Sequence, residues 1–163
     1  MKSKFRYPAY FVGLGGILAA FSFARFFTGY MLKSSTPILL FVPICVFFFF
    51  ACWCFFWGEI RAKIVSVEIN EGKICVKRYI GLGATHVYPI ECITGFNTSV
   101  LHSKGNAYEY LYLMIDNKKI AKLSEFYHSN YKDLKMCILT SGIDNLGFKR
   151  YSNREEFKDL FSK

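Results

Sequence analysis

The sequence predicts an α+β protein, with a hairpin of two transmembrane helices followed by a small antiparallel β barrel or sandwich that C-terminal helices cap. Three observations predict this class. Long uncharged runs fill most of the first 57 residues, the apolar pattern changes to alternation after residue 62, and helix signals return only after residue 129. The chain therefore divides into a hairpin, residues 1–59, and a β domain, residues 60–163.

Two apolar runs are long enough to cross a bilayer. The first begins at Pro8, carries no charge up to Ala24 and stays apolar beyond Arg25, and the second is the uncharged run Pro37–Trp57. A helix crosses the roughly 30 Å hydrocarbon core with about 20 residues at about 1.5 Å each. We therefore expect spans at about residues 8–30 and 37–57, because phenylalanine clusters on every side of a helix do not suit a soluble domain of this size.

The charges beside the spans predict their orientation. The connection at residues 33–36 is so short that both ends of the hairpin must face one side. Basic residues on that side are Lys2, Lys4, Arg6, Arg61 and Lys63, whereas the connecting turn has Lys33 and a snorkelling Arg25. The positive-inside rule then predicts a multi-pass protein of the cell inner membrane with both termini in the cytoplasm.

A cleaved signal peptide is the alternative for the first span. Residues 2–6 form a basic region, residues 7–21 an apolar region, and Ser22-Phe23-Ala24 has the small-x-small form of a cleavage site. Cleavage would leave one span. The apolar run continues past the cut, which favours an uncut helix.

Small residues on the first span predict close helix packing. Gly16, Ala20 and Ala24 repeat every four residues, and Arg25 lies beside them. Such a ridge lets two helices approach closely. The second span of the same chain is the expected partner, and a homodimer is the alternative.

The second half of the chain reads as strands and then helices. Period-two alternation and turn residues such as Asn70-Glu71-Gly72 and Asp116-Asn117 predict hairpins. Asn130 is expected to cap a helix over 130–141 that ends at Gly142, and a second helix is expected over 153–162. The expected strands are 64–69, 73–80, 85–90, 93–101, 107–115 and 118–123.

Several function classes are disfavoured. The net charge of +9 is divided almost evenly between the two halves, which predicts no nucleic-acid partner, because such partners need basic residues gathered on one face. The six cysteines form no CxxC pair and suit a reducing compartment as small apolar residues, so no metal site is expected. No catalytic motif is present. We expect neither enzymatic activity nor a cofactor.

The β domain resembles a known superfamily. The stretches VEINEGKICVKRYIG, VYPIECITGF and YEYLYLMIDNKKIAKLSEF, followed by a capped helix, are similar to membrane-anchored bacterial proteins with a pleckstrin-homology-like (PH-like) domain. The resemblance covers roughly residues 62–141. It implies a PH-like fold held at the membrane. Members that bind phosphoinositides carry basic residues around the first hairpin, where this chain also has Glu68 and Glu71.

The short tether predicts contact with the membrane surface. Four residues, 58–61, separate the second span from the strands. Basic side chains near anionic lipid each add about 1 kcal/mol of attraction. The candidate lipid- or partner-facing residues are Arg61, Lys63, Lys73, Lys77, Arg78, Lys118, Lys119 and Lys122.

The sequence thus predicts a membrane-anchored, non-enzymatic binding module for lipid or for a protein partner that it does not identify. If exposed, Tyr108, Tyr110 and Tyr112 would supply contact area. The alternative is a small membrane immunity protein that neutralises a toxin through the hairpin itself, at Arg25 and the ridge of small residues.

Overall fold

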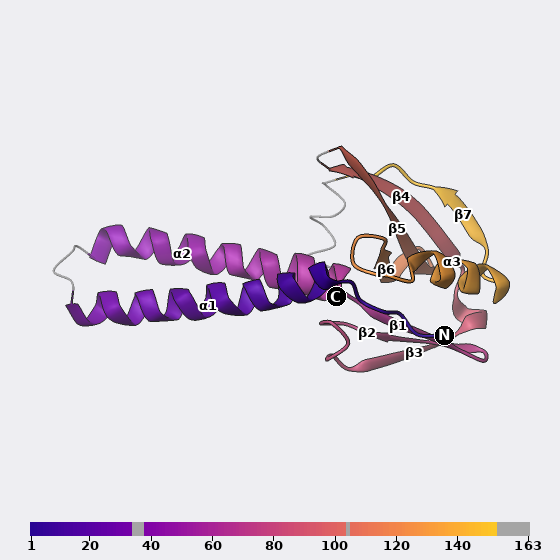
Figure 1. Ribbon diagram of the computed structural model, residues 1–163, viewed down its shortest axis with the longest axis horizontal. Coiled ribbons are helices and arrows are strands. Elements are labelled where there is room, and N and C mark those ends of the chain that lie inside the picture. The colour runs from indigo at the N-terminus through magenta and orange to yellow at the C-terminus, as the bar shows by residue number, and fades with distance from the viewer. Residues whose placement is uncertain (34–37, 104, 153–163) are drawn as a thin grey trace.

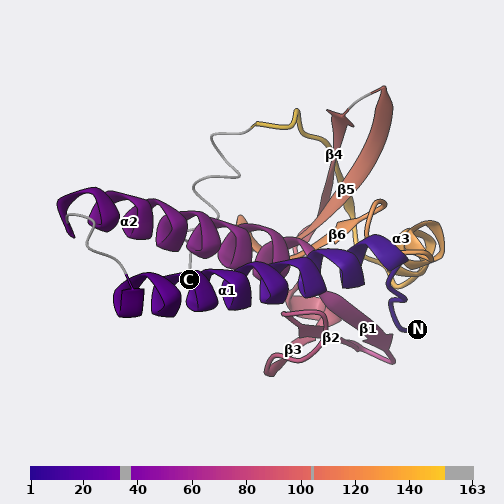
Figure 2. The same cartoon turned by 60° about the vertical axis from the view of Figure 1, so that its left-hand side comes forward.

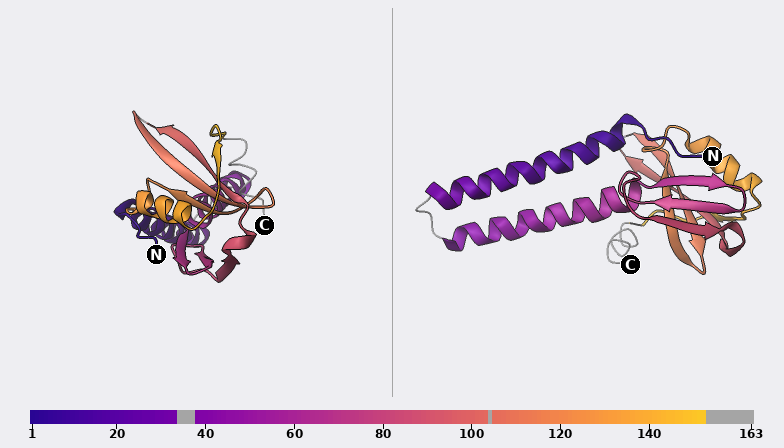
Figure 3. Two further views of the ribbon diagram at one scale, coloured as in Figure 1. Left: turned by 90° about the vertical axis from the view of Figure 1, so that its right-hand side faces the viewer. Right: turned by 90° about the horizontal axis from the view of Figure 1, so that it is seen from below.

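The computed structural model describes residues 1–33, 38–103 and 105–152. It is an α+β protein with two long apolar helices and two small sheets, which confirms the coarse class. The helices lie side by side and project from one end of the β-rich part (Figures 1 and 3). The expected helix over 153–162 lies outside the described residues.

Both expected apolar helices are present. Helix α1 spans Tyr7–Lys33 and helix α2 spans Ile38–Phe55, continuing as a π-helical segment, η1, over Phe56–Arg61. Only 11% of the apolar stretch within α1 is buried inside the protein, and only 6% of the stretch that runs from Val42 in α2 to Arg61 in η1. Their length and composition suit a membrane span, and their exposure distinguishes them from core helices of a soluble protein.

The two helices touch at few points. The ring of Phe23 stacks on Phe48 with centroids 4.2 Å apart. Gly16 lies under Phe55, where an added Cβ would stand 2.6 Å from the ring, so a larger residue would have to displace this ring. Ala20 and Ala24, the other members of the predicted ridge, are exposed, as is Arg25.

The first sheet is a three-stranded antiparallel meander. Strands β1 (Ser66–Asn70), β2 (Lys73–Lys77) and β3 (Thr85–Pro89) lie in chain order. Val67 pairs with Val76 and Ile69 with Ile74, so the predicted hairpin is confirmed with its apolar residues on one face. A short 3-10 helix, η2 (Ile90–Cys92), leads to the second sheet.

The second sheet has four strands in the order β6-β5-β4-β7. Strands β4 (Gly95–Ser103), β5 (Asn106–Ile115) and β6 (Lys118–Ser124) form antiparallel hairpins, as expected. Strand β7 (Asn145–Phe148) pairs parallel with β4 and was not anticipated. A four-residue strand has too little alternation to be recognised without its partner.

Helix α3 (Tyr131–Thr140) and the two sheets share one core (Figures 1 and 2). The described strands form two separate sheets and no closed barrel, so of the predicted barrel or sandwich the barrel is not confirmed. The connection through η2 moves the chain from one sheet to the other. The largest fully buried core side chains are Phe96, Ile74, Leu111, Leu113, Leu123, Leu134 and Ile138.

The ends of α3 are only partly as predicted. Gly142, with φ of 80°, follows the helix and ends it, because this backbone conformation suits glycine. Asn130 precedes the helix but makes no side-chain capping bond. Its amide instead binds the N-terminal segment, accepting from the Lys4 nitrogen at 2.8 Å and donating to the Lys2 carbonyl at 3.0 Å.

Candidate membrane-interface site

Residues 1–6 are built into the β-rich part. The Ser3 nitrogen donates to the Val67 carbonyl at 2.8 Å, and the Val67 nitrogen donates back to Ser3 Oγ at 2.9 Å. The Arg6 nitrogen donates to the Tyr127 carbonyl at 2.8 Å. Figure 1 shows this segment running along β1 to the start of α1. The first helix is therefore fixed to β1 and to the segment between β6 and α3 before it begins.

The N-terminal segment carries a strand signal that the sequence reading passed over. Ser3 is buried and Phe5 half-buried, whereas Lys2, Lys4 and Arg6 are exposed. This is period-two alternation over a few residues. The alternation is too short to predict a strand by itself, because the uncharged helix begins directly after it.

A second fixed point joins α2 to the β-rich part. Tyr127 Oη donates to Glu59 Oε2 at 2.9 Å, and Glu59 Oε1 forms an ion pair with Lys63. Burial, followed by the charge of Glu59, raises the pKa of Tyr127. Tyr127 packs with Ala9 and Ile64, both fully buried. Glu59, the one acidic residue among residues 1–59, is thus used in a joint between helix and sheet.

His128 lies in the same joint. Its ring is fully buried, with Nε2 2.9 Å from the Val65 carbonyl oxygen and Nδ1 2.9 Å from that of Ser124. Phe5 packs on the ring with centroids 5.3 Å apart. Burial lowers the pKa of His128 and outweighs the two carbonyl oxygens, which favour the protonated ring. The imidazole is therefore neutral at neutral pH, and sequence alone did not distinguish it from the other two histidines.

An apolar groove lies beside the start of α1. It is an open groove with a volume of about 560 Å³, and it lies between α1, η1 and the loop that joins β2 to β3. Tyr10, Leu14 and Ile17 line its helix side, and Ile80 and Leu82 line its loop side. Leu82 is 88% exposed and stands between two glycines, a context that gives no sequence signal for a site.

The loop beside the groove is strained and anchored. Tyr79 and Ile80 have φ of 55° and 60°, a conformation that is rare for a β-branched residue such as isoleucine. The Ile80 nitrogen donates to the Ile64 carbonyl at 3.0 Å, and the Gly83 nitrogen donates to the Arg78 carbonyl at 2.9 Å. Such strain persists only where the surrounding structure holds it, and it concentrates at functional sites.

The structure places the eight predicted basic residues on several different elements. Lys77 and Arg78 lead directly into the loop beside the groove, and Arg61 and Lys63 follow α2. Lys73 lies at the far end of β2, four residues from Lys77 and therefore about 13 Å away. The remaining three, Lys118, Lys119 and Lys122, lie on β6 in the other sheet.

Two of the β6 lysines pack on aromatic rings. Lys122 Nζ lies 4.3 Å from the centroid of Tyr110, and Lys119 Nζ lies 4.7 Å from that of Tyr112. Lys122 is only 7% exposed. Because cation–π contact holds these side chains on the sheet, the structure gives them a packing role.

The predicted tyrosine contact surface is covered. Tyr110 and Tyr112 are 4% and 6% exposed, and Tyr151 stacks near Tyr110 with centroids 6.2 Å apart. Tyr108 is half-buried against Phe126. Period-two alternation correctly placed these tyrosines on one face but did not show that the later chain returns over it.

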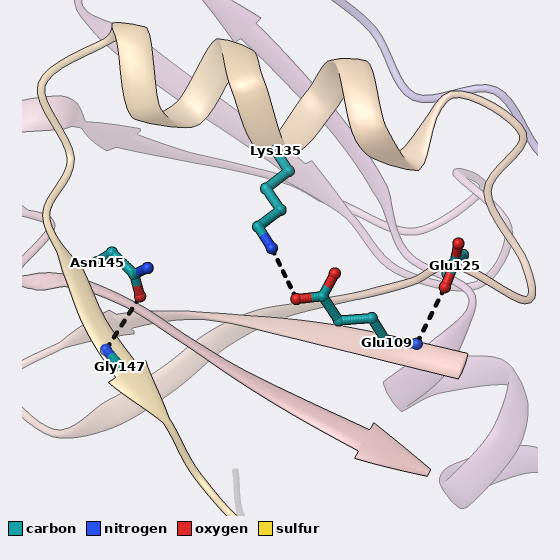
Figure 4. A network of polar contacts seen from close by, with 5 residues as sticks. All are labelled: Glu109, Glu125, Lys135, Asn145 and Gly147. Carbon is teal, nitrogen blue, oxygen red and sulfur yellow. Dashed lines mark hydrogen bonds and ion pairs between the residues drawn. The ribbon is translucent and has the colours of Figure 1, made fainter. Parts of the chain in front are cut away.

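A polar network holds α3 against the second sheet (Figure 4). Lys135 Nζ forms a 2.7 Å ion pair with Glu109 Oε1, and the Glu109 nitrogen donates to Glu125 Oε2 at 3.2 Å. Burial, followed by the charge of Glu109, raises the pKa of the nearby Tyr131. Within residues 1–33, 38–103 and 105–152, no group of three His, Cys, Asp or Glu residues could hold a metal ion.

Comparison with known proteins gives no relative on which to assign a function. No protein-family model, no curated protein and no solved structure matches this chain. The resemblance to PH-like proteins therefore stays a prediction from sequence pattern.

Proposed function

We propose that this chain is a two-span membrane protein that holds its β-rich part at the membrane surface as a non-enzymatic binding module. One observation carries the proposal, the incorporation of residues 1–6 into the β-rich part. Because Ser3 is hydrogen-bonded to Val67 and Lys4 to Asn130, the chain before α1 and the chain after α2 belong to one folded unit. Both ends of the helical pair then lie on one side of a bilayer that the pair crosses.

The outward faces of the helices support a lipid environment. Phe21 of α1 is 64% exposed, and Phe47 and Phe49 of α2 are each 72% exposed. Burying such a side chain is worth about 1.5–3 kcal/mol, which water cannot provide. The hydrocarbon core of a bilayer would bury the exposed apolar side chains of both helices without any further protein.

The cytoplasmic side of the inner membrane suits the charges. Residues 1–6 carry three basic residues and no acidic one, and Arg61 and Lys63 follow the second helix. The positive-inside rule places this side in the cytoplasm. We further propose that the β-rich part is PH-like, on the strength of its sequence pattern and its two sheets around one core with a helix between them.

Cleavage of α1 as a signal peptide conflicts with the packing. A cut after Ala24 would remove Ser3 and Ala9, which are 6% and 0% exposed. It would also leave the free edge of β1 and the Asn130 amide without their partners. The proposal therefore keeps α1 as a retained span.

Membrane extraction and terminal reporters test the proposal. The full chain should stay in the membrane fraction after alkaline carbonate and be released by detergent. Reporters active only in the cytoplasm should work at either terminus, and reporters active only outside should fail at both. Recovery in the soluble fraction, or reporters on opposite sides, would overturn it.

A second function, toxin neutralisation within the membrane, has one supporting observation. Ala20, Ala24 and Arg25 are exposed on α1, so they remain open to another helix. An anchor swap separates the two functions. If an unrelated two-span anchor carrying the same β-rich part keeps activity in the cell, the binding module is supported, and loss with the new anchor favours toxin neutralisation.

A further inference from the structure

We propose that the groove between α1 and the loop Tyr79–Gly83 holds one acyl chain of an anionic phospholipid, with the headgroup beside Arg6 and Arg78. The inference deepens the proposed function and rests on α1 spanning a bilayer. It assigns a specific lipid position to a protein whose eight predicted basic residues lie on several different elements.

The groove has the dimensions and lining of an acyl-chain site. It runs along α1 from Tyr7 to Ile17, ten residues or about 15 Å of helix. The hydrocarbon core is roughly 30 Å thick, so the groove is about as long as one leaflet is deep. Beyond Ile17 the same helix continues with the exposed Leu18 and Phe21, so the groove opens onto the lipid-facing surface.

The groove is preformed by a tight contact between loop and helix. An added Cβ on Gly13 would stand 2.6 Å from Ile80 Cδ1, so the loop rests directly on the helix at this glycine. The Ile80 nitrogen bonds to Ile64, a fully buried residue of the joint. Leu82 extends beyond this contact as the outer wall of the groove. A fixed wall lowers the entropy lost when a flexible chain binds.

Two basic residues adjoin groove-lining residues in the chain, and in the proposal they attract the headgroup. Arg6 directly precedes Tyr7, and Arg78 directly precedes Tyr79, and both tyrosines line the groove. The lining segments 7–17 and 79–82 contain no acidic residue, and Glu59, which precedes the lining residue Ile60, is ion-paired with Lys63. A negative headgroup is therefore attracted, whereas a zwitterionic one gains little. A protein helix or a second copy of the chain could occupy the groove only by displacing the lipid that surrounds α1.

Photocrosslinking of the full chain in phosphatidylcholine bilayers tests the site. One arm contains phosphatidylglycerol with a diazirine on one acyl chain, and the other contains phosphatidylcholine with the same chain. Peptide mapping should find labels on residues 10–17 and 79–82, with more from phosphatidylglycerol. Equal labelling by both probes, or protein–protein crosslinks in place of lipid at these residues, would overturn the inference.

Two variant pairs sharpen the test. Arg78→Gln should lower the preference for phosphatidylglycerol by about fivefold, whereas Lys73→Gln, at the far end of β2, should leave it unchanged. Leu82→Ser should reduce labelling of the loop and of residues 10–17. Met136→Ser on α3 removes a similarly exposed side chain away from the groove and should not reduce it. If each control changes labelling as much as its partner, the inference is wrong.

The same experiment separates the two proposals. Labels on Phe21 and Phe26 of α1 report the helix in lipid, whereas labels on Leu82 report the groove. No lipid label on α1 overturns the proposed function. Labels on α1 without labels on the loop overturn only the acyl-chain site.

Discussion

The helical pair and the β-rich part treat apolar side chains in opposite ways. In the β-rich part, Phe96, Leu111 and Leu123 are fully buried, whereas in the helices Phe47 and Phe49 are 72% exposed. The same residue type is thus hidden from solvent in one region and presented to it in the other. The difference is the one expected if the β-rich part faces water and the helical pair faces lipid. The joint around Glu59, Tyr127 and His128 lies where the two regions meet.

The largest expected effect tests this contrast directly. Phe96→Ala should lower the free energy of unfolding by about 3–5 kcal/mol, because it leaves a cavity in the shared core. Phe49→Ala removes the same side chain from an outward position and should change it little in detergent micelles. Chemical unfolding followed by near-UV circular dichroism measures both. Equal losses would mean that α2 packs against protein, and the contrast would fail.

The next effect tests how firmly α1 is fixed to the sheets. Asn130→Ala removes two hydrogen bonds to residues 2 and 4 and should destabilise the chain by about 1–3 kcal/mol. Proteolysis should then cut the N-terminal segment faster. Asn70→Ala, at an exposed turn residue, is the matched control. If the N-terminal segment stays protected in Asn130→Ala, the amide does not hold it.

A smaller effect tests the joint at α2. Tyr127→Phe removes the hydroxyl that donates to Glu59. Because the Glu59 side chain is 33% exposed, the free energy of unfolding should fall by only about 1 kcal/mol. Hydrogen exchange should rise around residues 59–64. Tyr108→Phe, on a half-buried ring elsewhere, should leave exchange there unchanged. Unchanged exchange in Tyr127→Phe would show that Lys63 alone holds Glu59.

The smallest expected effect is a pH dependence from His128. Its pKa is lowered in the folded chain, so below about pH 6.5 the unfolded chain takes up a proton that the folded chain does not. The free energy of unfolding that the neutral His128 contributes above that pH is lost as the pH falls toward the pKa of His128 in the folded chain. Denaturant midpoints across this range should fall less steeply in His128→Gln. His86→Gln, at an exposed position, should keep the slope, and an unchanged slope in His128→Gln would contradict the assignment.

Elements with a local signal were predictable. Absence of charge over a sufficient length gave α1 and α2, alternation gave β1 to β6, and Gly142 gave the end of α3. Each signal depends on residues a few positions apart. The helix boundaries observed, Tyr7–Lys33 and Ile38–Phe55, differ from those expected by a few residues, as terminal turns do.

Elements that depend on a distant partner were not predictable. Strand β7 exists because it pairs with β4, about 50 residues earlier in the chain. Asn130 looked like a cap, but its amide is occupied by Lys2 and Lys4. The groove needs Gly13 and Ile80 in contact, and neither residue marks it alone.

By itself, the sequence determined which segments are apolar helices and which are alternating strands, because chain geometry and local hydrophobic pattern are properties of neighbouring residues. Only the tertiary structure decided that residues 1–6 join the sheets, that Glu59 meets Tyr127, and that a loop closes a groove on α1. These contacts join residues about 65 positions apart. Their free energy depends on the whole fold bringing them together, which no local pattern records.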